Sequence, residues 1–255
     1  MLAEALAAKL CYAETGVKPA ESRNELYVMW NIFGWYHQGF RKGNRELELG
    51  PERNRDVLQA WQAVDADWSE LREIYAIALS NEGIAPSQFD RAVVLTGSVT
   101  DAATKLVAKV RSAYADELGL RGFGSALLLD LYERQRMLAE RIAKGVCLVA
   151  RGDASARQLS ELSRTIEIFS VSMEAFQTGR EDVGVPKPPT ARIAQSLSDG
   201  LSHWRPIAAF AYASAAGQRL APNELAEFAG AMTLFIVSMT AAINDLASHQ
   251  NQERG

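Results

Sequence analysis

The sequence predicts an all-α protein built as two tandem four-helix bundles. Apolar residues recur at three- and four-residue steps along almost the whole chain, while the alternating runs that are typical of strands are scarce. Alanine, leucine, glutamate, arginine and glutamine are abundant, and most prolines stand between the periodic segments. A third observation, a repeat within the chain, divides the helices into two sets of four.

We expect eight helices. Their predicted ranges are 2–15, 21–42, 52–80, 87–117, 125–151, 155–178, 189–216 and 223–248. Gly16 and Gly43 mark the ends of the first two, since glycine readily adopts the left-handed conformation that ends a helix. Pro86 opens the fourth, because proline is tolerated in a first turn. Pro206 lies inside the seventh range and is expected to kink that helix or to split it near Trp204.

The two halves of the chain are related by an offset of 136 residues. The matched pairs include Met1-Leu2-Ala3-Glu4 with Met137-Leu138-Ala139-Glu140, Cys11 with Cys147, Trp68 with Trp204, and Ala85-Pro86 with Ala221-Pro222. One offset that holds through helices and loops indicates an internal duplication. We therefore assign one four-helix bundle to residues 1–118 and a second to residues 125–250. Residues 119–124 join them, and Ser125 is the expected N-cap of the fifth helix.

The composition limits the classes of protein. Charged residues make up 23% of the 255 and the formal net charge is −4, so the basic excess of a nucleic-acid-binding protein is missing. No apolar run approaches the roughly 18–20 residues needed to cross a bilayer, and residues 231–243 are interpreted as a buried helix. The three histidines have no metal-ligand spacing, and no nucleophile–base pair stands out. We therefore expect no metal, no cofactor and no enzymatic activity.

The predicted fifth helix has two distinct faces. An apolar stripe, which should face the core of the bundle, consists of Leu131, Leu138, Ile142, Val146 and Val149. A second face carries small residues together with two charged ones: Arg136, Glu140, Ala143 and Cys147. The equivalent small residues of the first helix are Ala7 and Cys11. We expect an interface between the first and fifth helices along these small residues. The alternative is that they fill each bundle and that Arg136 pairs with Glu140.

The run RQRML, residues 134–138, carries a resemblance to a known family. It resembles part of the signature of the PilJ-type domain, the N-terminal sensing region of type IV pilus methyl-accepting chemotaxis transducers. It is also similar to the P-box of the NarX and NarQ nitrate and nitrite sensor kinases. The resemblance implies a four-helix bundle in which an arginine, here Arg136, holds an anion. The other candidate ligand-binding residues are Arg134, Met137 and Glu140.

The function implied by this resemblance is small-molecule sensing in signal transduction. The implied ligand is a small oxyanion such as nitrate or nitrite, which suits a guanidinium because its parallel N–H donors match a planar anion. Output would pass to an unidentified signalling partner, and the paired first helices would come from the two repeats or from two subunits of a homodimer. The alternative function is a structural helical module that binds another protein and no small ligand.

Two further expectations concern the start of the chain and its two cysteines. Met1 aligns with Met137 of the RQRML run, so we expect Met1 to be an internal methionine of a similar motif. The longer product would be periplasmic, whereas a product that starts at Met1 would be cytoplasmic. The sequence leaves open whether Cys11 and Cys147 pair.

Aromatic residues are dense in the second predicted helix. Those that share one stripe, and that are expected to pack in the core, are Tyr27, Trp30, Phe33, His37 and Phe40. Trp35 and Tyr36 point elsewhere, and an interface or a ligand is the open alternative for them.

Overall fold

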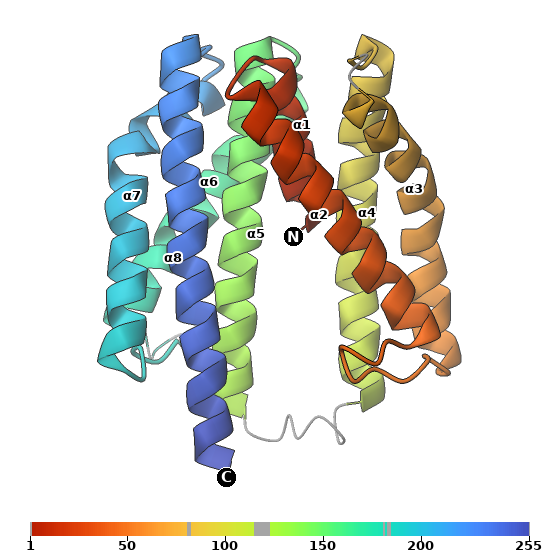
Figure 1. Ribbon diagram of the computed structural model, residues 1–255. Helices are drawn as coiled ribbons and strands as arrows, with labels where there is room; N and C mark the ends of the chain where they lie inside the picture. The colour runs from red at the N-terminus through yellow and green to blue at the C-terminus, as the bar shows by residue number, and fades with distance from the viewer. Residues whose placement is uncertain (1, 81–82, 115–122, 181, 183–184, 255) are drawn as a thin grey trace. The chain divides into compact units, whose positions relative to one another are not determined.

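The structure, a computed structural model, describes residues 2–80, 83–114, 123–180, 182 and 185–254. Its helices (Figure 1) are α1 (Leu2–Glu14), α2 (Pro19–Lys42), α3 (Arg55–Leu79), α4 (Pro86–Tyr114), α5 (Phe123–Arg151), α6 (Ala156–Thr178), α7 (Ala191–Ala215) and α8 (Pro222–Arg254). Across these described ranges there is no strand, and extended pairing is limited to two isolated β-bridges, Asn44 with Leu49 and Arg180 with Val185. The predicted all-α class is therefore confirmed.

The contacts between helices divide the chain into two compact units. The first contains Leu2–Glu14 and Lys18–Arg121, and the second contains Thr15–Val17 and Gly122–Gly255. In the first unit, α3 packs along α4, α1 packs against α2 and α4, and α2 contacts α3. In the second unit, α5 contacts α6, α7 and α8, while α7 packs along α8 and contacts α6. Packing of this kind supplies most of the stability of a helix, because short isolated helices are marginal in water.

Each unit has a core of large apolar side chains. In the first, the side chains of Leu26, Leu71, Tyr75, Phe89 and Leu95 are almost completely buried. In the second, the ring of Phe169 lies at the centre, 4.7 Å from the ring of Trp204 and 5.0 Å from that of Phe235. Burying one such side chain contributes about 1.5–3 kcal/mol to the free energy of unfolding.

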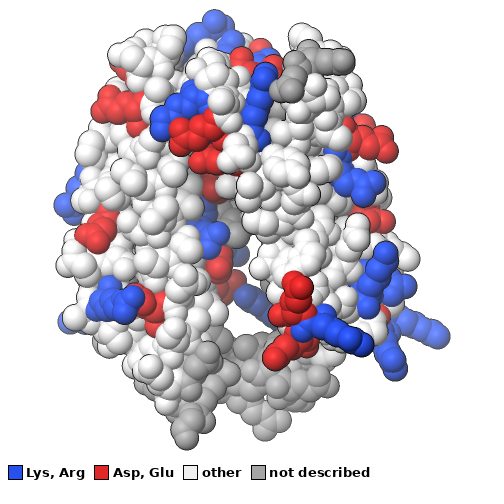
Figure 2. All heavy atoms as spheres, in the orientation of Figure 1, with Lys and Arg blue, Asp and Glu red and all other residues white. Residues whose placement is uncertain are grey.

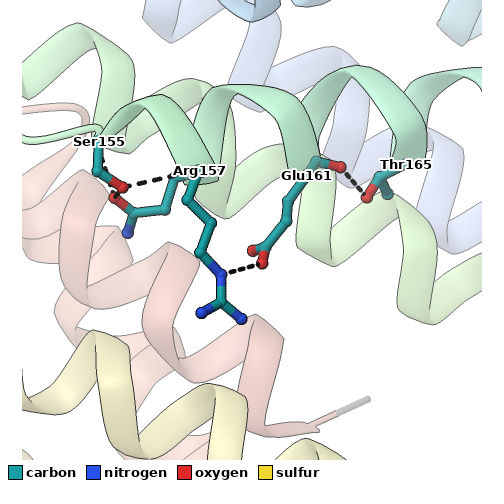
Figure 3. A network of polar contacts seen from close by, with 5 residues as sticks. Ser155, Arg157, Glu161 and Thr165 are labelled. Carbon is teal, nitrogen blue, oxygen red and sulfur yellow. Dashed lines mark hydrogen bonds and ion pairs between the residues drawn. The ribbon is translucent and has the colours of Figure 1, made fainter.

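The start of α6 illustrates how the sequence begins a helix. Ser155 Oγ accepts a hydrogen bond from the N–H of Gln158, and the Gln158 side chain accepts one from the N–H of Ser155, which together form a capping box. Farther along, Arg157 pairs with Glu161 at 2.9 Å, and the Thr165 hydroxyl donates to the Glu161 carbonyl at 2.6 Å (Figure 3). The exposed cap fixes where α6 begins and contributes about 1 kcal/mol.

Two expectations about helix boundaries are corrected: the split that was one of the two alternatives at Pro206, the other being a kink, and the N-cap at Ser125. Helix α7 continues from Ala191 to Ala215 with Pro206 inside it, so Pro206 does not split it. Because Pro206 is exposed, water can bind the carbonyl that has lost its N–H partner. Helix α5 begins at Phe123, so Ser125 lies inside the helix and not at its N-cap. Residues 119–122 of the predicted joint lie outside the described residues.

The helix bounds of the two halves agree with the offset of 136. Helices α3 and α7 differ by 136 at both ends, α4 and α8 begin at Pro86 and Pro222, and the two β-bridges also differ by 136. Gly43 and Gly179 end α2 and α6 with φ of 83° and 74°, a conformation that a side chain would strain. These agreements support the duplication, which stays our proposal.

Helix α8 is both long and apolar. Within Pro222–Gln250 an 18-residue window has a mean hydropathy of 1.6, so the stretch meets the length and composition of a membrane-spanning helix. It also packs against α5 and α7 with Phe228, Met232, Phe235 and Met239 in the core, as a core helix of a soluble protein does. Since both kinds of helix pass this test, the predicted absence of a membrane-spanning segment stays an expectation.

The surface carries charges of both signs. On the face shown in Figure 2, basic and acidic side chains are interspersed among uncharged ones. Some of them pair closely: Arg91 donates two hydrogen bonds to Glu70, at 2.7 and 2.6 Å. These hydrogen bonds lower the pKa of the Glu70 carboxyl and raise the pKa of Arg91. Both groups are exposed, so solvent screens the pair and it adds little to stability.

Candidate functional site

The RQRML run lies in the middle of α5, which turns each of its residues in a different direction. Arg134 is exposed, Gln135 is buried, Arg136 and Met137 are half-buried, and Leu138 is buried. At about 100° per residue, Arg134 and Arg136 lie about 200° apart around the helix. The run therefore does not present its two arginines to the same ligand, although Arg136 and Glu140 share a face.

Arg136 is the residue of this run that has a buried donor without an acceptor among the described residues. Its side chain is 18% exposed, and its Nη1 lies 3.8 Å from Oε1 of Glu133, one turn earlier. Its Nε is buried and has no hydrogen-bond acceptor among the described residues. A buried donor without an acceptor is rare in native proteins, so a bound acceptor is a natural explanation of it. The 3.8 Å contact with Glu133 is long and half-exposed, and such a pair contributes little.

The other predicted site residues are buried to different degrees. Met137 is half-buried and Glu140 is 5% exposed. The residues of the predicted interface are small and fully buried: Ala7 and Cys11 in α1 of the first unit, and Ala143 and Cys147 in α5 of the second. Neither cysteine is a free thiol. The interface itself stays a prediction.

Gln135 is a structural residue that our sequence analysis missed. Its side chain is 1% exposed, and its Nε2 donates a hydrogen bond to the carbonyl of Phe169 in α6 at 2.6 Å. The signal was present in the sequence, because Gln135 precedes Leu138 by three residues and Ile142 by seven, on the stripe assigned to the core. A polar residue on that stripe requires a buried partner.

Tyr132 lies one turn before Arg136 and is also buried. Its ring contacts the ring of Phe176 in α6 edge-on at 5.0 Å, and its side chain is completely excluded from solvent. Its hydroxyl has no hydrogen-bond partner among the described residues. Burial raises the pKa of Tyr132 to about 12, so the phenol is neutral at physiological pH.

Helix α2 departs from the predicted packing of its aromatic stripe. Tyr27 is 53% exposed, and the other members of the stripe are half-buried. The buried residues of α2 are Ser22, Leu26 and Gly39. The stripe is therefore only partly in the core: the ring of Phe33 packs on the buried ring of Trp68 at 4.0 Å, whereas Trp30 and His37 line hollows beside α3.

In the part of the chain that the structure describes, no three His, Cys, Asp or Glu side chains are grouped so that they could hold a metal ion.

Comparison with known proteins gives one match. Residues 134–228 match the family model described as type IV pili methyl-accepting chemotaxis transducer N-term, PilJ. This match supports a PilJ-type domain. The PilJ-type segment begins at Arg134, the first residue of the RQRML run, and continues through α6 and α7 into α8. No curated protein and no solved structure matches the chain.

The match, which covers less than half of the chain, suggests a sensing or signalling module of this chemotaxis type for residues 134–228. The match does not extend to the nitrate and nitrite sensor kinases, so the predicted similarity to them stays a prediction.

Proposed function

We propose that the PilJ-type segment binds a small oxyanion such as nitrate or nitrite and passes the signal to a partner protein. Arg136 is the proposed anchor for the anion. The observation that carries this proposal is its half-buried guanidinium, whose Nε lies in the protein interior without an acceptor. An oxyanion would supply that acceptor through a charge-assisted hydrogen bond.

The position of Arg136 also suits the transmission of a signal. Its helix, α5, contacts each of the other three helices of its unit. A ligand that binds one arrangement of these helices better than another shifts the population toward it. A partner that recognises the favoured arrangement would then receive the signal.

A thermal-shift titration of the full chain tests the proposal. Nitrate and nitrite are compared with chloride at equal ionic strength, so that a general salt effect cancels. At about 100 times the dissociation constant, a ligand adds roughly 2.7 kcal/mol and raises Tm by about 5–10 °C. Arg136→Ala should abolish this rise. The control is Arg157→Ala, which removes an exposed arginine of α6 and should leave the rise unchanged.

A second function is favoured by one observation, the exposed apolar surface of α2. Val28, Ile32 and Tyr36 are 45%, 37% and 48% exposed. A contiguous exposed apolar patch is typical of a surface that binds another protein. If nitrate and nitrite leave Tm unchanged while Ile32→Glu disrupts a complex isolated with the chain, the structural interaction module replaces the sensing module.

A further inference from the structure

Helices α2 and α3 of the first unit border a cleft of about 300 Å³. It is lined by Trp30, Asn31, Gly34, Trp35 and Gln38 of α2 and by Arg72 of α3. A second hollow of about 180 Å³ shares Gln38 and Arg72, and therefore continues the first along the same two helices. Ligand pockets generally measure roughly 300–1,000 Å³, so the cleft suits a small molecule.

Contacts between α2 and α3 hold one end of this groove in place. The His37 ring stacks on Trp61 of α3 at 4.6 Å, and its Nε2 lies 2.8 Å from Oδ1 of Asp65. The indole N–H of Trp61 donates in turn to the carbonyl of His37 at 3.1 Å. In the cleft of about 300 Å³, the space beside Gly34 is open, because a Cβ added there would meet no atom within 4 Å. The groove is thus preformed.

Two of the polar groups that line the cleft, on Trp30 and Arg72, are donors without acceptors, whereas the Asn31 amide already donates to the carbonyl of Tyr27 at 2.8 Å. The indole N–H of Trp30 is buried and has no hydrogen-bond partner among the described residues. Arg72 is exposed, and no described residue forms an ion pair or a hydrogen bond with it. By contrast, Arg91 in the same unit donates two hydrogen bonds to Glu70. A ligand in the cleft would therefore meet a free guanidinium and an unused N–H.

The charges around the groove favour an anion, and its walls favour an aromatic ring. Three cationic side chains line the two hollows, Arg41, Lys42 and Arg72, against one carboxylate, Asp65, which is already engaged by His37. A guanidinium binds a carboxylate through parallel hydrogen bonds. Two indole rings in the lining offer faces and edges against which a flat ring packs in offset or edge-on geometry.

The corresponding groove of the second unit has a different lining. It forms a cleft of about 280 Å³ beside α6 and α7. With the offset of 136, Trp35 is replaced by Val171, Gln38 by Glu174 and Arg72 by Ala208. That cleft therefore lacks both the aromatic wall and the counterpart of Arg72, although it contains Arg205 and also Arg180, which pairs with Asp182. The second groove serves as an internal control for the first.

We propose that the α2–α3 cleft binds a small aromatic carboxylate. Arg72 holds the carboxylate, Trp30 and Trp35 flank the ring, and the Trp30 N–H and the Gln38 amide bind the remaining acceptor atoms. This site is separate from Arg136, which lies in the other unit.

Isothermal titration calorimetry of the full chain tests the site with three probes. Benzoate carries both the ring and the carboxylate, benzamide keeps the ring without the charge, and acetate keeps the charge without the ring. We expect benzoate to bind with a dissociation constant below about 5 mM and the other two to bind at least tenfold more weakly. No heat from benzoate up to about 10 mM, or equal binding of acetate or benzamide, would overturn the proposal.

Matched variants then test the residues. Arg72→Gln removes the charge from an exposed residue without a partner, so it should fold normally and weaken benzoate binding at least tenfold. Gly34→Leu fills open space on a helix and should abolish binding without loss of helical circular dichroism. Arg205→Gln, in the cleft of the second unit, should change nothing. If Arg72→Gln binds benzoate as the unmodified chain does, or if Arg205→Gln weakens binding equally, the assignment is wrong.

Discussion

Gln135 is predicted to hold α5 against α6, although it lies inside the RQRML run between two candidate ligand-binding arginines. The test is Gln135→Ala, which removes the hydrogen bond from Gln135 Nε2 to the carbonyl of Phe169 and most of a side chain that is 1% exposed. The carbonyl of Phe169 then loses the donor of a buried hydrogen bond. The removed atoms leave a space between α5 and α6, near the backbone of Phe169.

The size of the effect follows from these two losses. One buried amide–carbonyl hydrogen bond contributes about 0.5–1.5 kcal/mol, and truncating a buried side chain of this volume costs at least as much again. Together they lower the free energy of unfolding by about 2–4 kcal/mol, which at roughly 2–4 °C per kcal/mol corresponds to a decrease in Tm of about 5–15 °C. Gln135→Met restores the volume without the donor, so about 1 kcal/mol of the loss should remain.

Thermal and urea denaturation followed by circular dichroism measure this loss. Arg134→Ala is the matched control, because Arg134 is the exposed neighbour and its truncation should change the free energy of unfolding by less than about 0.5 kcal/mol. Equal Tm values for Gln135→Ala and Arg134→Ala would refute the structural role of Gln135, and with it the packing of α5 on α6 described here.

Three further predictions follow from the described contacts. Burial raises the pKa of Tyr132 to about 12, above the value of about 10 in the unfolded chain. The contribution of Tyr132 to the free energy of unfolding is therefore intact below about pH 10, and it is lost as the pH rises from there toward 12. Urea denaturation curves at about pH 9 and about pH 11 measure this decrease, and Tyr132→Phe should reduce it. Gly43→Ala should cost about 1–3 kcal/mol in the same assay, whereas Gly34→Ala should not, because at φ 83° the added Cβ would lie 2.9 Å from the nitrogen of Pro51. Alkylation of the denatured chain should label neither Cys11 nor Cys147 until a reductant is added; label without reductant, seen by mass spectrometry, would contradict the oxidised state of both.

The elements that could be predicted from the sequence are those set by local chemistry. The starts of α4 and α8 were predicted within one residue because Pro86 and Pro222 are suited to a first helical turn, and Gly43 was recognised as the glycine that ends α2. Each of these signals acts within a few residues of the chain. No knowledge of the tertiary contacts was needed.

The parts that were not predicted depend on which neighbour a residue meets. The helical period places the aromatic residues of α2 on one stripe, but it cannot distinguish a residue that faces the core from one that borders a groove. Trp30, which lines the cleft beside α3, is an example of the second kind. The split expected at Pro206 did not occur because that side of α7 faces water. Arg136 was chosen from a resemblance, whereas its orphaned Nε is visible only once its surroundings are known.

Helix α8 has a consequence for the synthesis of this protein on the ribosome. Its apolar stretch emerges after α5 and α7, the helices against which it packs. Both binding surfaces are therefore already made when Phe228, Met232 and Phe235 leave the exit tunnel, and the stretch can be covered as it appears. A chain in which α8 came first would expose the same apolar side chains throughout synthesis, when aggregation and capture by the membrane-insertion machinery compete with folding. The order of the helices thus shortens the time during which the most apolar segment is exposed.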